Sequence, residues 1–364
     1  MEDKNTMIKK NDCSNFTILK SIKQFDSISN LQKVIISCLL LGFLFFMFTP
    51  FTTFKHLLPL DETKQNIYTD CLTNYQKQIE MHWILLAVIF LGLCTIFMYY
   101  SLNALNHIRL KQKFQNKLIH NDFLLYYQPI VSPEQNKVVA CEALLRMKDK
   151  DRILSPFHFL DTMDKLDMME DITIWILKRI IEDYQEIRTS IANLDEDFYI
   201  SLNISFKELE SPLFIERMKN VLSGVDLTKI KLCFEIVEKY KLHDKKPINL
   251  ILQELKLLGI KIAIDDFGVE YANLDMLGKI DYDIIKLDKQ FIDNIQNSFI
   301  HQESILFITK IIKYYKKILV IEGLEDYSQL KVLQKLSSEI IYIQGYLYSP
   351  PISLEELKQF KISL

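Results

Sequence analysis

Eight polar side chains in the last two-thirds of the chain each come at the end of a short apolar run. They are Glu142, Asn203, Glu235, Asp265, Asp266, Lys286, Glu322 and Gln344. The runs, among them KLCFE, KIAIDD and ILVIE, are short and rich in Val, Ile and Phe, which is typical of buried strands. Packing does not require a carboxylate at the end of such a strand. Five of the eight groups are carboxylates, and hard divalent cations prefer oxygen ligands.

The elements that must position these groups alternate along the chain from residue 121 onward. LLYYQPIV and VVACEALL begin the series as a hairpin, and amphipathic stretches at 172–187, 211–223, 248–259, 303–317 and 327–338 separate the later apolar runs. An open parallel sheet usually gathers its site at one switch point, whereas here a polar group follows every strand. We therefore predict an α/β fold, a TIM-like (β/α)8 barrel with its active site at the carboxyl ends of the strands.

The adjacent pair Asp265 and Asp266 makes a local prediction. Consecutive residues of a regular strand face opposite sides of the sheet. If both aspartates serve one site, the strand must end at Asp266, and Phe267 and Gly268 then begin a loop.

Two uncharged apolar segments precede the barrel. Residues 34–51 and 83–102 contain no Asp, Glu, Lys or Arg, and each can cross a hydrocarbon core of ~30 Å as a helix. A buried core helix usually keeps a polar face, so transmembrane helices are favoured. Basic residues cluster before the first segment and after the second, which predicts that both termini are cytoplasmic. The stretch NIYTDCLTNYQKQIEMHW between them has the pattern of a helix that extends the second span.

These features divide the chain into six parts. We expect a cytoplasmic N-terminal tail at 1–33, transmembrane helices at 34–51 and 83–102, a short periplasmic loop at 52–82, a juxtamembrane linker helix at 103–120 and the barrel domain at 121–364. The linker helix has apolar residues at Leu105, Ile108, Phe114 and Leu118, which fit either pairing with a second copy or a solvated spacer.

Charge and cysteine content exclude other classes. The net charge of −3 implies no bulk attraction to a nucleic acid polymer. No CxxC spacing suggests zinc. Cys71 is alone in the predicted outer loop, so an intramolecular disulfide is excluded there, while a Cys71–Cys71 link between two chains stays open.

The order of the motifs resembles that of the EAL family of bacterial cyclic di-GMP phosphodiesterases. Glu142-Ala143-Leu144 is the triplet that names the family, and it follows a YQPI motif at 127–130. Six further motifs are similar in order and spacing, namely NIS at 203–205, EIVE at 235–238, DDFG at 265–268, KLD at 286–288, EGLE at 322–325 and QGY at 344–346. The resemblance covers about residues 115–360 and leaves out the membrane region.

The resemblance implies an enzyme that linearises cyclic di-GMP to pGpG with two Mg²⁺ or Mn²⁺ ions in each site. Two such metals can screen the phosphodiester, generate the nucleophile and stabilise the leaving oxygen. Metal ligands are implied at Glu142, Asn203, Glu235, Asp265 and Asp266. An acidic pocket of this density repels an anionic dinucleotide until metals fill it, so substrate binding should depend on metal.

The resemblance also implies roles for the remaining motif residues. Lys286 would orient the attacking water, Glu322 would act as a general base or second-metal partner, and Gln344 would position the water. Substrate contacts are implied at Gln128, Arg146, Asp288 and Glu325, and support of the loops at Glu238, Phe267 and Gly268. A homodimer is implied as well. The apolar segments and the basic residues beside them, rather than the resemblance, predict that it lies in the bacterial inner membrane with the barrel in the cytoplasm.

Two departures from the family pattern keep alternatives open. Active members typically read DDFGTGYSSL, whereas Val269 and Glu270 here give DDFGVEYANL, and the lost glycine tolerated a positive φ. A catalytically weak or inactive domain that binds cyclic di-GMP, or a partner protein, is therefore an alternative. A third reading makes Lys286 the Schiff-base lysine of a barrel aldolase, but the surrounding carboxylates argue against it.

Overall fold

The computed structural model describes residues 62–237, 246–268, 277, 280–336 and 341–362, without the side chains of 62–72, 76, 246 and 247. Four predicted features lie outside these residues, namely the N-terminal tail, the first transmembrane segment, Glu238 and the loop at 269–276, whose sequence departs from the family pattern. The chain divides into two compact units, Met1–Ile96 and Phe97–Leu364.

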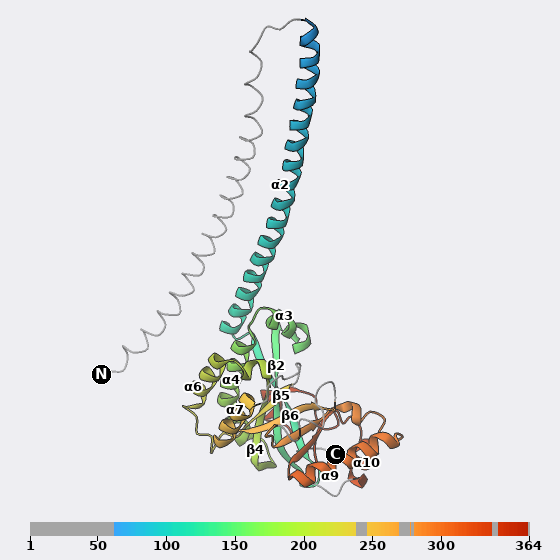
Figure 1. The fold of residues 1–364 in the computed structure, drawn as a ribbon. Coiled ribbons are helices and arrows are strands. Elements are labelled where there is room, and N and C mark those ends of the chain that lie inside the picture. Colours follow the sequence, from blue (N-terminus) through green and yellow to red (C-terminus); the bar gives the residue numbers. More distant parts are fainter. Residues whose placement is uncertain (1–61, 238–245, 269–276, 278–279, 337–340, 363–364) are drawn as a thin grey trace, which may run out of the picture. The chain divides into compact units, whose positions relative to one another are not determined.

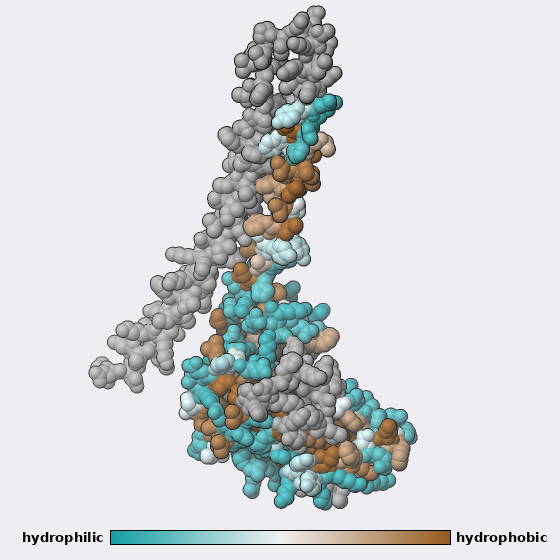
Figure 2. All heavy atoms as spheres, viewed as in Figure 1, coloured by the Kyte–Doolittle hydropathy of each residue, from teal (hydrophilic) through white to brown (hydrophobic). Residues whose placement is uncertain are grey.

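A single helix, α2, runs from Glu62 to Ile119 (Figure 1). It contains both the second predicted transmembrane segment and the stretch expected to extend it, so that helical extension is confirmed. Apolar side chains are exposed along its middle, as the brown band in Figure 2 shows; they include Ile84, Leu85, Val88, Leu91 and Leu93. In the described part of the chain, one helix is long and apolar enough to cross a membrane, with a mean hydropathy of 2.3 and no buried residue in its most apolar window.

The other unit is built around one sheet of ten strands. Their order is β10-β1-β9-β8-β7-β6-β5-β4-β2-β3, and an additional pairing of β1 with β2 closes eight of them into a barrel. The strands are β1 (Phe123–Ser132), β2 (Lys137–Asp149), β3 (Arg152–Leu154), β4 (Leu194–Ser205), β5 (Leu232–Val237), β6 (Lys261–Phe267), β7 (Ile284–Leu287), β8 (Ile318–Ile321), β9 (Ile341–Gln344) and β10 (Ile352–Ser353).

Helices surround the barrel, with α4, α6 and α7 on one side of Figure 1 and α9 and α10 on the other. The described helices of this unit are α3 (Leu160–Lys165), α4 (Met169–Ser190), α5 (Phe206–Leu209), α6 (Pro212–Leu222), α7 (Lys246–Leu257), α9 (Phe299–Tyr315), α10 (Tyr327–Leu336) and α11 (Leu354–Leu357), with 3₁₀ turns η2 (Pro156–His158) and η3 (Lys289–Phe291). The five amphipathic stretches predicted from the sequence correspond to α4, α6, α7, α9 and α10.

The barrel differs from an all-parallel one at its first strand. β1 runs antiparallel to both neighbours, β2 and β9, whereas the other barrel strands pair in parallel. The cause is local, because a short hairpin joins β1 to β2, and parallel strands would need a long crossover instead. The predicted hairpin and barrel are confirmed.

The end of α2 belongs to the barrel unit. Phe114 is buried within the main apolar core, and Leu118 packs against that core. Lys117 donates to the carbonyl oxygen of Lys148 at 2.8 Å and pairs with Asp149 at the end of β2. Phe114 and Leu118 therefore cannot form the seam with a second copy that the sequence pattern allowed.

The chain around the two aspartates differs from the prediction that the strand ends at Asp266. β6 does not end at Asp266 but continues to Phe267, which pairs with Leu287 of β7. The register shifts between Ile264 and Phe267, and Asp266 has a φ of 48°. This irregularity re-aims side chains, as bulges do, so both aspartates reach the same end of the barrel without the strand stopping.

Candidate active site

The barrel interior holds two layers of side chains. The lower layer is apolar and contains Ile130, Ala140, Tyr199, Cys233, Ala263, Ile284 and Val320. Side chains alternate along a strand, so the residue two positions further on points to the same side. On β2, β5, β6, β7 and β8 that next residue is a charged one, namely Glu142, Glu235, Asp265, Lys286 or Glu322. The predicted site residues therefore converge at the carboxyl ends of the parallel strands.

Lys286 lies at the centre of the upper layer and is 2% exposed. Its Nζ is close to four carboxylates, with contacts of 3.2 Å to Glu142 Oε2, 2.8 Å to Glu235 Oε2, 3.1 Å to Asp265 Oδ1 and 2.6 Å to Glu322 Oε1. One positive charge thus faces four acidic groups from four different strands. Burial alone would lower the pKa of Lys286, but attraction to these carboxylates raises it well above its ordinary value.

Glu142 organises the two amides of the site. Its Oε1 accepts a hydrogen bond from Asn203 Nδ2 at 2.9 Å, and its Oε2 accepts one from Gln344 Nε2 at 2.6 Å. Burial would raise the pKa of Glu142, yet Lys286 and these two amides hold it below its ordinary value. Both amides therefore turn their NH₂ groups toward Glu142. Their carbonyl oxygens, Asn203 Oδ1 and Gln344 Oε1, are buried and have no hydrogen-bond partner among the described residues.

The other carboxylates hold their protons more tightly. Burial, together with the negative charge of Glu142, raises the pKa of Glu235 well above its ordinary value, and burial raises that of Asp265. Burial also raises the pKa of Asp266 to about 6 and that of Glu322 to about 8. The group carries more acid than Lys286 can neutralise, and burying unpaired negative charge is unfavourable.

The chemistry of this donor set fits divalent cations. Ligand oxygens of Asp265, Asp266 and Glu322 lie within 4.8 Å of one another. The unpartnered oxygen of Asn203 is a further donor beside Glu142. Carboxylate and amide oxygens are ligands of hard cations, and added positive charge would offset the acidic excess.

The sequence matches the EAL domain over residues 111–351. The chain belongs to the EAL domain family. Among curated relatives, cyclic di-GMP phosphodiesterase PdeF of Escherichia coli K12 is 29% identical over 255 residues, covering 70% of this chain and 33% of PdeF. Probable cyclic di-GMP phosphodiesterase PdeB of the same organism is 27% identical over 308 residues, covering 82% of this chain and 57% of PdeB. The chain therefore spans about a third of PdeF and somewhat over half of PdeB.

A solved EAL domain protein from Listeria monocytogenes EGD-e is 28% identical and superposes with a TM-score of 0.59. The match covers 68% of this chain and 96% of the Listeria chain. It supports the assignment of residues after α2 to an EAL-type barrel.

The residues expected to contact substrate differ in placement. Arg146 lies on the same strand face as Glu142, half-buried, with its guanidinium carbon 5.2 Å from the centre of the Tyr126 ring. Its Nη1 donates to the carbonyl oxygen of Leu145 at 2.9 Å. Gln128 is buried, and both ends of its amide are engaged by protein groups. Arg146 is thus partly exposed, whereas Gln128 is enclosed.

Asp288 and Glu325 lie at the rim. Asp288 Oδ1 accepts a hydrogen bond from the Gln290 backbone N–H at 2.9 Å and so caps η3. Its negative charge also contributes to the raised pKa of Asp266, after burial and the charge of Asp265. Glu325 is exposed, and its backbone N–H donates to Gln329 Oε1 at 2.8 Å. Asp288 therefore has a capping role in addition to any contact with substrate.

Phe267 and Gly268, which follow the two aspartates, pack against the core and against η3. Phe267 is buried in the main core. Gly268 has a φ of 93°, and a Cβ there would overlap the ring of Phe291 in η3. Gln290 Nε2 donates to the Gly268 carbonyl oxygen at 3.3 Å. Their support of the loop stays a prediction, because the loop at 269–276 lies outside the described residues. Their contact with η3 was not predicted, because the motif pattern carries no signal for it.

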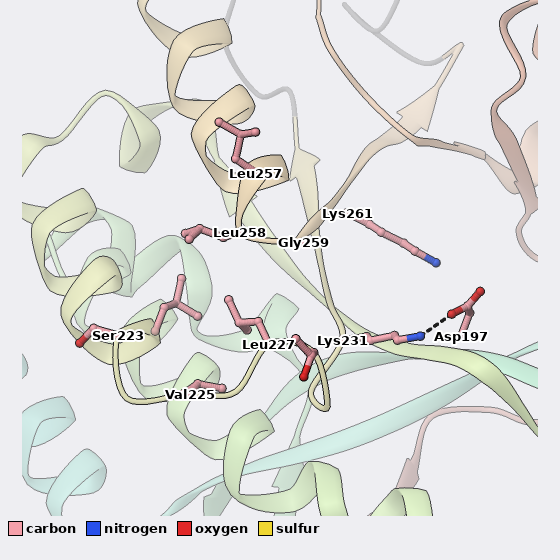
Figure 3. Close-up of a pocket in the computed structure, with 11 residues that line it drawn as sticks. Asp197, Ser223, Val225, Leu227, Lys231, Leu257, Leu258, Gly259 and Lys261 are labelled. Carbon is pink, nitrogen blue, oxygen red and sulfur yellow. Dashed lines mark hydrogen bonds and ion pairs between the residues drawn. The ribbon is translucent and has the colours of Figure 1, made fainter.

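A hollow lies at the opposite end of the barrel, where the parallel strands begin. It has a volume of about 810 Å³ and is lined by Leu222, Leu227, Leu257, Lys231 and Lys261, among others (Figure 3). Lys231 pairs with Asp197, and Lys261 lies over the Tyr199 ring. The charged lining residues are one carboxylate, Asp197, and two lysines, so this hollow does not share the acidic excess of the site.

Proposed function

We propose that the chain is a membrane-anchored phosphodiesterase specific for cyclic di-GMP, which it hydrolyses to linear pGpG. The observation that carries the proposal is the buried cluster in which one lysine faces four carboxylates at the ends of the family's ordered motifs. A site with this acidic excess is suited to cations, and through them to an anionic phosphodiester. PdeF, named as such an enzyme, is similar over 255 residues.

Two Mg²⁺ or Mn²⁺ ions fit the residues present. Glu142, Asn203, Glu235 and Asp265 would hold one ion, and Asp265, Asp266 and Glu322 would hold the other. When bound, such ions supply charge screening for the phosphate and acidify a coordinated water.

The remaining residues bind and orient. Lys286 directs the attacking water and balances the carboxylates around it. Gln344 Oε1, buried and unpartnered, is an acceptor for a proton of that water. Arg146 offers its fork of donors to a phosphate oxygen. Asp288 and Glu325 line the approach to the site.

The direct test is turnover of cyclic di-GMP by the full chain in detergent, with Mg²⁺, with Mn²⁺ and with a chelator. We expect pGpG only when metal is present, and loss of turnover in Glu142→Ala. Binding without turnover would favour the receptor alternative that the Val269 and Glu270 substitutions suggest. Trapping of a carbonyl substrate on Lys286 by borohydride would favour the aldolase reading.

Membrane anchoring is proposed from the apolar segments at 34–51 and 83–102 together with the exposed apolar middle of α2. The localisation is the bacterial inner membrane, with both termini and the barrel in the cytoplasm. The native cysteines test this topology, because Cys13 precedes the first segment and Cys71 lies between the two. A membrane-impermeant maleimide added to intact spheroplasts should label Cys71 and spare Cys13, and labelling of both or of Cys13 alone would refute the topology.

A homodimer is proposed through the outer face of α9. Ile300, Phe307 and Tyr314 are 70%, 53% and 82% exposed and recur every seven residues, which places them along one side of the helix. The same stripe on a second copy would cover this apolar surface. Phe307→Glu should convert a dimer to a monomer in light scattering, and an unchanged mass would place the contact elsewhere.

A further inference from the structure

Gln128, Gln344 and Glu142 meet where the reversed strand β1 joins its two neighbours. Gln128 lies directly opposite Glu142 in the β1–β2 pairing, and Gln344 pairs with Ile130 across β1 and β9. All three side chains are buried, at 8%, 4% and 6% exposure for Gln128, Gln344 and Glu142. Their hydrogen bonds form one continuous chain.

The direction of each bond in that chain follows from which groups can donate. The carbonyl oxygen of Ser349 can only accept, so Gln128 must turn Nε2 toward it, at 3.1 Å. Gln128 Oε1 then faces Gln344 and accepts from its Nε2 at 3.1 Å. Gln344 Nε2 also donates to Glu142 Oε2 at 2.6 Å, which engages both of its N–H groups.

One amide orientation of Gln344 is therefore enforced from two sides. Flipping the amide would bring Gln344 Oε1 against two acceptor oxygens, one from Gln128 and one from Glu142, and would remove both hydrogen bonds. In the observed orientation Oε1 is buried and has no partner in the described part of the chain. An unpartnered buried acceptor is unfavourable unless a ligand or water completes it.

We infer that Gln128 is a positioning residue, which holds the Gln344 amide so that Gln344 Oε1 points to the attacking water. The inference rests on the proposed function for the identity of that water. It replaces the direct substrate contact that the family resemblance implied for Gln128, because both ends of the Gln128 amide are already bonded to protein. Glu142 fixes Gln344 from the other side, and Ser349 anchors the chain of bonds through its backbone.

The test is Gln128→Met in the full chain, which keeps length and burial but removes both hydrogen bonds. We expect kcat to fall by ~10–100-fold, as when a residue that supports a reactive group is lost, while KM changes less than about twofold. A matched control is Tyr127→Phe, which removes a buried hydrogen bond to Asp183 from the opposite face of the same strand. It should lower thermal stability without a comparable fall in kcat. A rise in KM of tenfold or more at unchanged kcat in Gln128→Met would show a substrate contact and overturn the inference.

A second measurement does not depend on turnover. The thermal shifts of Gln128→Met, Gln344→Met and the double variant should be non-additive, with the double variant losing less than the sum of the single variants. Additive shifts would overturn the inference. If the wild type binds cyclic di-GMP without hydrolysing it, the proposed function fails, and the Kd of Gln128→Met then takes the place of KM. The cycle still decides whether Gln128 holds Gln344.

Discussion

Two layers of the barrel interior lie only two residues apart on each strand, yet they are built on opposite principles. The lower layer contains Cys233, Ala263, Ile284 and Val320, and it is apolar and fully buried. The upper layer contains Glu142, Glu235, Asp265 and Glu322, four carboxylates around the single lysine Lys286. Burial stabilises the lower layer and penalises the upper one. The same backbone thus supplies rigidity below and a site prepared for cations above.

The largest difference between the two layers is expected on β5, because this strand carries one residue of each layer and each can be changed separately. Glu235→Gln should reduce turnover by more than ~100-fold, which exceeds the usual loss when only a supporting group of a metal site is removed. The metal-free protein should be as stable as the wild type or more stable, because a buried acid with a raised pKa is removed.

Cys233→Ala is the counterpart in the lower layer. It should lower the melting temperature through a small cavity and leave kcat within a few-fold of the wild type. Turnover assays and melting curves of both variants provide the measurement. A destabilised Glu235→Gln that stays active would invert the assignment of the two layers.

The second test concerns the charge balance on β7. Lys286→Met leaves the carboxylates without their counter-charge and should destabilise the metal-free protein at pH 8 by roughly 3–5 kcal/mol. Ile284→Ala should cost a similar roughly 2–5 kcal/mol by leaving a cavity. Denaturant unfolding with and without Mn²⁺ separates the two. Mn²⁺ should stabilise Ile284→Ala about as much as the wild type, and Lys286→Met by more, because bound cations replace the lost counter-charge. No stabilisation of either variant by Mn²⁺ would contradict the proposed metal site.

The third test is pH dependence. Burial raises the pKa of Glu322 from 4.5 to about 8, so the folded metal-free protein keeps a proton that the unfolded chain releases. The stability from this group is fully present below about pH 4.5 and is lost as pH rises through about 8. Asp266, with a pKa of about 6, acts in the same direction at lower pH, and its contribution is already lost by about pH 6. The melting temperature in chelator should therefore fall between pH 6 and pH 9, by on the order of 5 °C.

Metal should oppose this trend. Deprotonated carboxylates bind cations more tightly, so the stabilisation by Mn²⁺ should grow from pH 6 to pH 9. Thermal shift curves with chelator and with Mn²⁺ make the measurement, and Glu322→Gln should flatten the slope in chelator. A metal-free protein that gains stability over this range would show that the upper layer is charge-balanced after all.

The smallest effect is expected at the rim that supports the upper layer. Gly268→Ala places a Cβ against Phe291 at a φ of 93°, which should cost roughly 1–3 kcal/mol. Removing the Phe291 ring relieves the overlap. The kcat of Gly268→Ala/Phe291→Ala should therefore exceed the value expected if the effects of the two single substitutions were independent, as measured in a double-mutant cycle. Gly224→Ala is a matched control, because a Cβ there meets no atom within 4 Å and the residue lies far from the site in the sequence.

Much of this site could be predicted from the sequence, because strand periodicity is local. Five of the residues that end the apolar runs each lie two positions after a lower-layer residue; they are Glu142, Glu235, Asp265, Lys286 and Glu322. The reversal of β1 in the sheet was partly visible as a hairpin. The course of β6 through Asp266 was not, since a positive φ at an aspartate depends on what the loop packs against.

The alternating elements, the acidic strand ends and the EAL motifs could be read from the sequence, because they depend on residue type and short spacing. Three contacts could be seen only in the folded chain: the pairing of Lys286 with four carboxylates at once, the burial of Phe114 in the core and the hydrogen bond between Gln128 and Gln344. Each of these contacts joins residues far apart in the chain, such as Gln128 and Gln344. Their partners are selected by barrel closure and register, which no local pattern specifies.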